Sequence, residues 1–141
     1  MGALVWLVLF IAANCALNLL TSGKIATSGI DFVLPAIILV AHSKGPAWGV
    51  VAASLIISAH FFTAPDKIHR LPFALLTGVI TAVVVGGVTA PLQTAVKIGI
   101  ITYHAFSFAA VMLFYRSMGM RYFLFMVLNI LFSAWVLSFF Y

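Results

Sequence analysis

Residues 31–53 read DFVLPAIILVAHSKGPAWGVVAA, and this stretch decides how the rest of the chain is interpreted. An apolar run from Asp31 to Ala41 leads into a short polar turn, His42–Pro46, and then into a second apolar run. Apolar runs that are continuous, rather than alternating with polar residues, are typical of helices in a lipid bilayer and not of a transmembrane barrel. The stretch therefore predicts a pair of membrane helices joined by a tight turn.

The composition extends this interpretation to the whole chain. Of the 141 residues, 65% are hydrophobic and 6% are charged, whereas soluble domains carry roughly 25% charged residues. A soluble domain could not keep a hydrated surface with so few charges. At roughly 20 residues per span, we predict an all-α protein, a polytopic transmembrane helical bundle of about six short-looped spans, forming a single integral membrane domain over residues 1–141.

The same pattern of apolar runs and polar turns continues toward both ends of the chain. The expected spans are 3–20, 31–41, 47–63, 71–90, 92–115 and 122–141. Proline is tolerated in the first turn of a helix, as at Pro72, and Pro91 ends the span before it. Because span 31–41 is short and contains Pro35, we expect it to be tilted, broken or extended backwards.

The basic residues indicate how the bundle is oriented. Seven Lys and Arg residues give a net charge of +5, and they are spread over the loops. A nucleic-acid surface would cluster them, so no nucleic-acid partner is expected. Loops one, three and five carry Lys24, Lys67, Arg70, Arg116 and Arg121, whereas loops two and four carry Lys44 and Lys97. The positive-inside rule then predicts cytoplasmic odd-numbered loops and external termini, in a prokaryotic cell membrane.

Small residues recur at a four-residue spacing that lets membrane helices approach closely. The spacing occurs at Ala12 and Ala16, at Gly45 and Gly49, and at Gly78, Ala82 and Gly86. One interpretation is packing within this chain. The other is docking to a second membrane protein, for which Ala12, Ala16, Gly45 and Gly49 are the candidate contacts.

Only two acidic residues occur, Asp31 and Asp66. A carboxylate at the mouth of an apolar segment requires a partner, a ligand or a wet cavity. Together with Lys24, Asp31 predicts a polar ligand or ion site at the end of the bundle. The alternative is that Asp31 caps a helix, where free backbone amides and the helix dipole favour an acid.

Histidines provide the other candidates. His60, Asp66 and His69 are weak candidates for a divalent metal, but their spacing is not that of a metal motif, and a solvated loop in which Asp66 pairs with Lys67 or Arg70 explains them equally. No metal is therefore assigned. His104 lies about two turns into a span, where a titratable group usually faces the bundle interior. It is either a ligand contact, a proton relay or a structural histidine.

Catalysis has little support in the sequence. No span holds a pair of carboxylates, and no nucleophile elbow, zinc-protease motif or phosphate-binding glycine loop occurs. We expect a protein that is not an enzyme and has no cofactor.

The segment 29–53 resembles small six-helix membrane proteins of the energy-coupling-factor S-component type and the MreD rod-shape proteins. The resemblance rests on GIDFVLP at 29–35 and on KGPAWGVVAA at 44–53, where Gly45-Pro46-Ala47-Trp48-Gly49 opens a helix after an apolar span. It implies a six-helix bundle without soluble domains, and it makes Ala12 and Ala16 similar to the docking stripe of S-components.

These observations predict a non-catalytic membrane subunit, most concretely an S-component-like subunit that binds a small molecule for a transporter. The candidate ligand contacts are Asp31, Lys24, His60 and His104. The expected partners are the lipid bilayer, other integral membrane subunits and a small-molecule ligand. The alternatives are an accessory subunit that packs against catalytic subunits of a larger complex and a small metal-dependent membrane enzyme.

Overall fold

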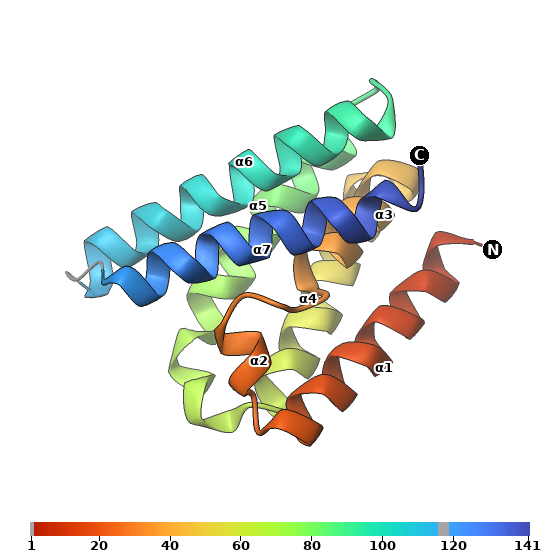
Figure 1. The fold of residues 1–141 in the computed structure, drawn as a ribbon. Helices are drawn as coiled ribbons and strands as arrows, with labels where there is room; N and C mark the ends of the chain where they lie inside the picture. Colours follow the sequence, from red (N-terminus) through yellow and green to blue (C-terminus); the bar gives the residue numbers. More distant parts are fainter. Residues whose placement is uncertain (1, 116–118) are drawn as a thin grey trace.

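The computed structural model describes residues 2–115 and 119–141, which are mostly helical and contain no strand (Figure 1). The predicted all-α class is therefore confirmed. The helices are α1 (Ala3–Thr21), α2 (Lys24–Thr27), α3 (Val33–Lys44), α4 (Pro46–Phe62), the 3-10 helix η1 (Pro65–Arg70), α5 (Leu71–Gly86), α6 (Leu92–Ala110), its π-helical continuation η2 (Val111–Tyr115) and α7 (Met120–Ser138). Arg116, one of the loop cations, lies outside the described residues.

Four helical segments within the described residues are long and apolar enough to cross a membrane: Ala3–Thr21, Pro65–Gly86, Leu92–Phe114 and Met120–Ser138. The segments Val33–Lys44 and Pro46–Phe62 are apolar but shorter. At 1.5 Å per residue, the 12 residues of α3 extend about 18 Å, well short of the roughly 30 Å hydrocarbon core. The structure thus supports a membrane protein with four candidate spans and two shorter apolar helices in place of six full spans.

The short helix α3 is the centre of the fold. Every residue from Val33 to Ala41 is buried, and α3 packs against α1, α4, α5, α6 and α7. The tightest packing is between α3, α4 and α5, because small residues lie at their crossing points. A Cβ on Gly49 would overlap Ala41 and Ala82, and one on Gly78 would overlap Ile57. The four-residue stripes at Gly49 and Gly78 therefore serve close packing within this chain.

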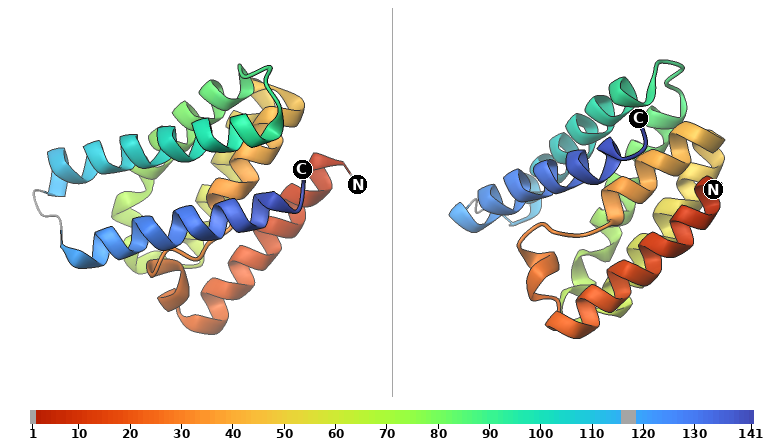
Figure 2. Two further views of the ribbon diagram at one scale, coloured as in Figure 1. Left: turned by 45° about the horizontal axis from the view of Figure 1, so that its top comes forward. Right: turned by 45° about the vertical axis from the view of Figure 1, so that its right-hand side comes forward.

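The link between α1 and α3 runs back along the bundle before α3 begins (Figures 1 and 2). It contains α2 and then residues 28–32, which lie beside α7. Gly29 has a φ of 102°, and a Cβ there would collide with the carbonyl oxygen of Phe125. Only glycine combines this backbone conformation with such a close approach. The link therefore returns along the bundle interior, and α3 begins in contact with α7.

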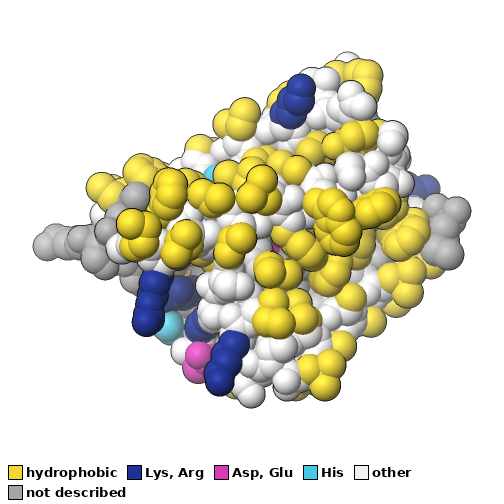
Figure 3. Space-filling view, in the orientation of Figure 1, with side chains coloured by type: hydrophobic (Ala, Val, Ile, Leu, Met, Phe, Trp, Pro, Cys, Tyr) yellow, Lys and Arg dark blue, Asp and Glu magenta, His cyan; other side chains and the backbone are white. Residues whose placement is uncertain are grey.

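Helices α6 and α7 run side by side and lean across the other helices (Figure 2). Figure 3 shows hydrophobic side chains over most of the visible face, with Lys and Arg side chains gathered mainly at one lower end. This face is therefore largely apolar with a basic end, as expected for a protein surrounded by lipid.

Candidate functional site

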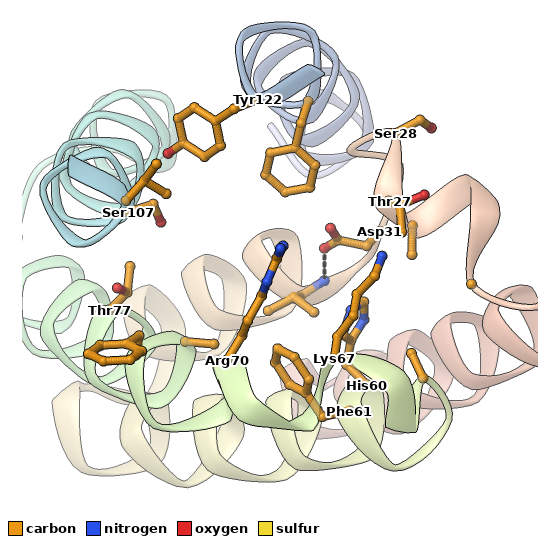
Figure 4. Close-up of a pocket in the computed structure, with 18 of the residues that line it drawn as sticks. Thr27, Ser28, Asp31, His60, Phe61, Lys67, Arg70, Thr77, Ser107 and Tyr122 are labelled. Carbon is orange, nitrogen blue, oxygen red and sulfur yellow. Dashed lines mark hydrogen bonds between the residues drawn. The ribbon is translucent and has the colours of Figure 1, made fainter. Parts of the chain in front are cut away.

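A cleft separates α6 and α7 from the α4–α5 side of the bundle, and the link from Gly23 to Asp31 borders it (Figure 4). Its volume is about 950 Å³, at the upper end of the roughly 300–1,000 Å³ of ligand pockets. Three of its walls consist of residues spaced three or four apart, which share one helix face: Lys67, Arg70, Ala74 and Thr77; Tyr103, Ser107 and Ala110; Arg121, Phe125 and Leu128, with Tyr122 beside Arg121. The cleft is therefore formed by three converging helix faces.

Asp31 lies on the inner wall of this cleft and is 6% exposed. Its Oδ1 accepts a hydrogen bond from the Val33 amide (2.9 Å), and its Oδ2 accepts one from Asn129 Nδ2 (3.2 Å). The same Asn129 nitrogen donates to the Gly29 carbonyl at 2.9 Å. Asp31 thus binds the first amide of α3, as a cap does, and also faces the cleft. Both interpretations of this residue from the sequence describe part of its position.

His60 is held by a buried hydrogen-bond network between α1 and α4. The side chains of Asn14 and Asn18 are fully buried. Asn14 Oδ1 accepts a hydrogen bond from the Phe32 amide (3.1 Å), which fixes the orientation of the Asn14 side chain. Its Nδ2 then donates to His60 Nδ1 (3.0 Å). Since Nδ1 accepts, the neutral His60 ring carries its proton on Nε2.

The Asn18 amide adds to this network from the next turn of α1. Asn18 Nδ2 donates to the His60 carbonyl (3.2 Å) and to Thr63 Oγ1 (2.9 Å), and it approaches His60 Nδ1 at 3.5 Å. The Nδ1 edge of His60 therefore faces α1, and His60 also lines the cleft.

Three cationic residues line the outer part of the cleft: Lys67, Arg70 and Arg121, here called the basic mouth. Lys67 and Arg70 point from η1 into the cleft, and His60 lies beside Lys67 (Figure 4). Lys67 also interacts electrostatically with Arg70 and with the exposed Asp66. The mouth therefore carries a surplus of positive charge.

Hydroxyl groups line the deeper part of the cleft. The Tyr103 hydroxyl lies within electrostatic range of Asp31 and of Tyr122. Tyr122 points toward the wall of the cleft that contains Ser107 (Figure 4), and among the described residues its buried hydroxyl has no hydrogen-bond partner. The cleft thus combines apolar walls with polar groups that have hydrogen-bonding capacity left over, the usual composition of a small-molecule site.

The other residues predicted from the sequence lie elsewhere. Lys24 is exposed on α2, and neither Lys24 nor His104 is among the described residues that line the cleft. His104 is buried on α6, near Asn129, and neither of its ring nitrogens makes a hydrogen bond of good geometry within the described part of the chain.

The four candidate docking residues divide into two pairs. Ala12 and Ala16 are exposed on the outer side of α1. Gly45, with a φ of 88°, forms the turn between α3 and α4, and Gly49 is buried against Ala41 and Ala82. The alanine pair is therefore available to a partner, whereas Gly49 is covered by this chain.

A metal centre has no geometric support in the described residues. No group of three or more His, Cys, Asp or Glu side chains lies close enough there to hold a metal ion. Asp66 and His69 are exposed on η1, whereas His60, on α4, is held through its Nδ1 by Asn14 and Asn18.

The basic mouth and the two tyrosines are the site residues that the sequence interpretation missed. From the sequence alone, Lys67 and Arg70 are interpreted as topology determinants in a solvated loop. The signal was their spacing, because Lys67, Arg70, Ala74 and Thr77 follow a helical period that continues a basic turn into an apolar span.

Comparison with known proteins gives no assignment: no protein-family model, curated protein or solved structure matches this chain.

Proposed function

We propose that this chain is a membrane-embedded subunit that binds a small molecule in the cleft, as part of a transport system. The observation that supports the proposal best is the convergence of buried Asp31, His60, the tyrosine hydroxyls and the basic mouth on one cavity of about 950 Å³. Polar groups at membrane depth are costly unless they serve a ligand or an internal network.

The architecture around Asp31 supports the same proposal. Membrane proteins tolerate non-helical backbone at membrane depth where it is buried in protein or lines a cavity, and transporters place their sites at such interrupted helices. Residues 28–32 have this position, between the bundle interior and the cleft. We propose that the α1–α3 link and the short helices α3 and α4 together complete a six-segment bundle, as in the S-components that residues 29–53 resemble.

Whether a small molecule occupies the cleft is tested with a variant in which a bulky side chain fills the cleft. Ala110→Trp places an indole on the cleft-lining face of α6, and Ala105→Trp places the same group on the exposed face of that helix. Native mass spectrometry of the protein purified in a mild detergent should show a co-purifying small molecule with the wild type and with Ala105→Trp. The molecule should be lost with Ala110→Trp. Equal occupancy in both variants would contradict the proposed site.

The exposed face of α1 favours a second role, as an accessory subunit. Ala12 and Ala16 lie on that face and allow a partner helix to approach closely. If the chain packs against a larger complex, Ala12→Trp should release it from the subunits with which it co-purifies. Leu19→Trp, also exposed on α1, is the control. Dependence on Ala12 without any cleft ligand would favour the accessory role over small-molecule binding.

A further inference from the structure

The walls of the cleft differ in hydrogen-bonding character from one end to the other. At the outer end, the polar groups of the basic mouth are donors, because ammonium and guanidinium groups have no acceptor. Apart from the hydroxyl groups of the deeper part, the remaining walls are largely apolar and include Ile57, Phe61 and Leu128. A ligand that satisfies both ends needs an acceptor-rich group attached to an apolar body.

His60 belongs to the donor end, and the hydrogen-bond network determines this. His60 Nδ1 is occupied as an acceptor by Asn14, whose own orientation is fixed by the Phe32 amide. The neutral ring then carries hydrogen on Nε2. Nε2 is not among the buried nitrogens that lack a partner, and no hydrogen bond to Nε2 occurs among the described residues. His60 therefore offers an N–H donor next to Lys67.

We infer that the ligand of the cleft is an amphipathic oxyanion: a molecule with a carboxylate or phosphate group at one end and an apolar body. This inference rests on the proposed function. Its oxygens are bound by His60 Nε2 and Lys67, with Arg70 and Arg121 adding positive charge. Charge-assisted hydrogen bonds of this kind are roughly twice as strong as neutral ones. Asn14 and Asn18 are positioning residues that hold the His60 ring in the required tautomer.

Asp31 limits which anions fit. Its carboxyl oxygens lie on the inner wall, away from solvent, and accept hydrogen bonds from the Val33 amide and Asn129; such acceptors pair with a donor and not with the oxygens of a second anion. The oxyanion is thus confined to the outer end, and the inner end accepts an uncharged group or a hydrogen-bond donor. The site therefore selects a molecule with a single anionic end.

The inference is tested on the full chain in an uncharged detergent with three probes of similar size: phenyl phosphate, benzyl alcohol and benzylamine. Dissociation constants are measured by ligand-observed NMR. We expect phenyl phosphate to bind at least tenfold more tightly than benzyl alcohol, and benzylamine to bind more weakly than either. Tighter binding of benzylamine than of phenyl phosphate would overturn the oxyanion assignment and leave the cleft as a binding site for another class of molecule.

Two variants test the named donors. Lys67→Gln should weaken phenyl phosphate binding about tenfold, whereas Lys44→Gln, an identical charge change on an exposed residue at the end of α3, should change it less than twofold. His60→Asn keeps an acceptor near the position of Nδ1 and removes the Nε2 donor, and it should also weaken the phosphate probe about tenfold. Unchanged affinity in both Lys67→Gln and His60→Asn would overturn the assignment.

The tautomer is tested independently of binding and of stability. In protein labelled with ¹⁵N-histidine, the resonances of His60 should show a protonated Nε2 and an unprotonated Nδ1 in the wild type. Asn14→Ala should shift the population toward the other tautomer. A ring protonated on Nδ1 in the wild type would overturn the positioning role of Asn14.

The same preparation separates the two sources of such an oxyanion. Mass spectrometry of an organic extract identifies a lipid headgroup if an anionic lipid is displaced by phenyl phosphate, and a water-soluble ligand if the displaced molecule remains in the aqueous phase. Either result supports the oxyanion class. If none of the three probes binds and Ala110→Trp displaces nothing, the proposed function itself fails.

Discussion

The helices in the two halves of this molecule pack through different kinds of side chains. In the first, α3, α4 and α5 meet through glycine and alanine, their contact surfaces are apolar, and α3 is buried along most of its length. In the second, α6 and α7 also pack against α3 and α5 through apolar residues such as Gly99. They differ in burying three polar side chains, His104, Asn129 and Ser133, here called the polar seam, and in bordering the cleft. The first half, with η1 and the α1–α3 link, therefore holds the shape of the cleft and carries Asp31, His60 and Lys67, while α6 and α7 add Tyr103, Tyr122 and Arg121.

The largest effect on stability is expected in the apolar half, where two neighbouring glycines, Gly86 and Gly87, have different surroundings. A Cβ on Gly86 would lie 2.5 Å from backbone atoms of Pro46, whereas one on Gly87 meets only ordinary contacts at 3.6 Å. Gly86→Ala should destabilise the protein by about 1–3 kcal/mol, the usual cost of overpacking. Gly87→Ala should be neutral or stabilising by about 0.4–1 kcal/mol, because its backbone is in the right-handed region. Unfolding in mixed detergent micelles measures both, and equal effects would contradict close packing at this crossing.

This contrast also explains how much of the fold could be read from the sequence. Continuous apolar runs located the helices, and the predicted starts at residues 47 and 92 lie within one residue of the starts of α4 and α6. Pro91 was expected to end the preceding span at residue 90, but α5 already ends at Gly86. The 3-10 helix η1 and the short α2 were not predicted, because each depends on local turns and tertiary contacts rather than on apolar periodicity. The position of residues 28–32 in the bundle interior could not be predicted either. It depends on a contact between Gly29 and α7, which lies about a hundred residues later in the chain.

The candidate site was accessible in part for similar reasons. Asp31 and His60 stood out because polar groups are rare in this chain, and both line the cleft. Tyr103 and Lys67 did not stand out, because aromatic and loop cations are common at membrane boundaries. Only the three-dimensional arrangement shows that the faces carrying them converge.

The network between α1 and α4 is the first polar element to test against the apolar half. Asn14→Ala removes the acceptor for the Phe32 amide and the nearer donor to His60 Nδ1, which keeps only the 3.5 Å contact with Asn18. We expect a loss of about 1–2 kcal/mol, in the upper range for polar contacts in membrane proteins. Thr21→Ala removes a hydroxyl that bonds only to the Leu17 carbonyl of its own helix and should cost less than about 0.5 kcal/mol. A similar cost for both would mean that the network does not hold α1 against α4.

The polar seam offers a sharper comparison within the second half. Asn129 donates to both Gly29 and Asp31, whereas the buried Ser133 hydroxyl has no partner among the described residues. Asn129→Ala should cost about 1 kcal/mol and loosen residues 28–32, which hydrogen exchange of their amides would report. Ser133→Ala should be neutral or slightly stabilising, because no hydrogen bond is lost. A larger loss of stability with Ser133→Ala than with Asn129→Ala would show that Ser133 has a partner that stabilises the seam.

The smallest effect is expected at His104, a buried polar residue of the seam. Both ring nitrogens are buried without a well-formed hydrogen bond in the described residues, so the ring bears a desolvation cost without full compensation. His104→Phe keeps an aromatic ring of similar shape and should change stability by less than about 1 kcal/mol, in either direction. Because His104 does not line the cleft, affinity for phenyl phosphate should stay within twofold of the wild type. A large loss of affinity with unchanged stability would move His104 into the site, and α6 would then bind the ligand together with η1 and α4.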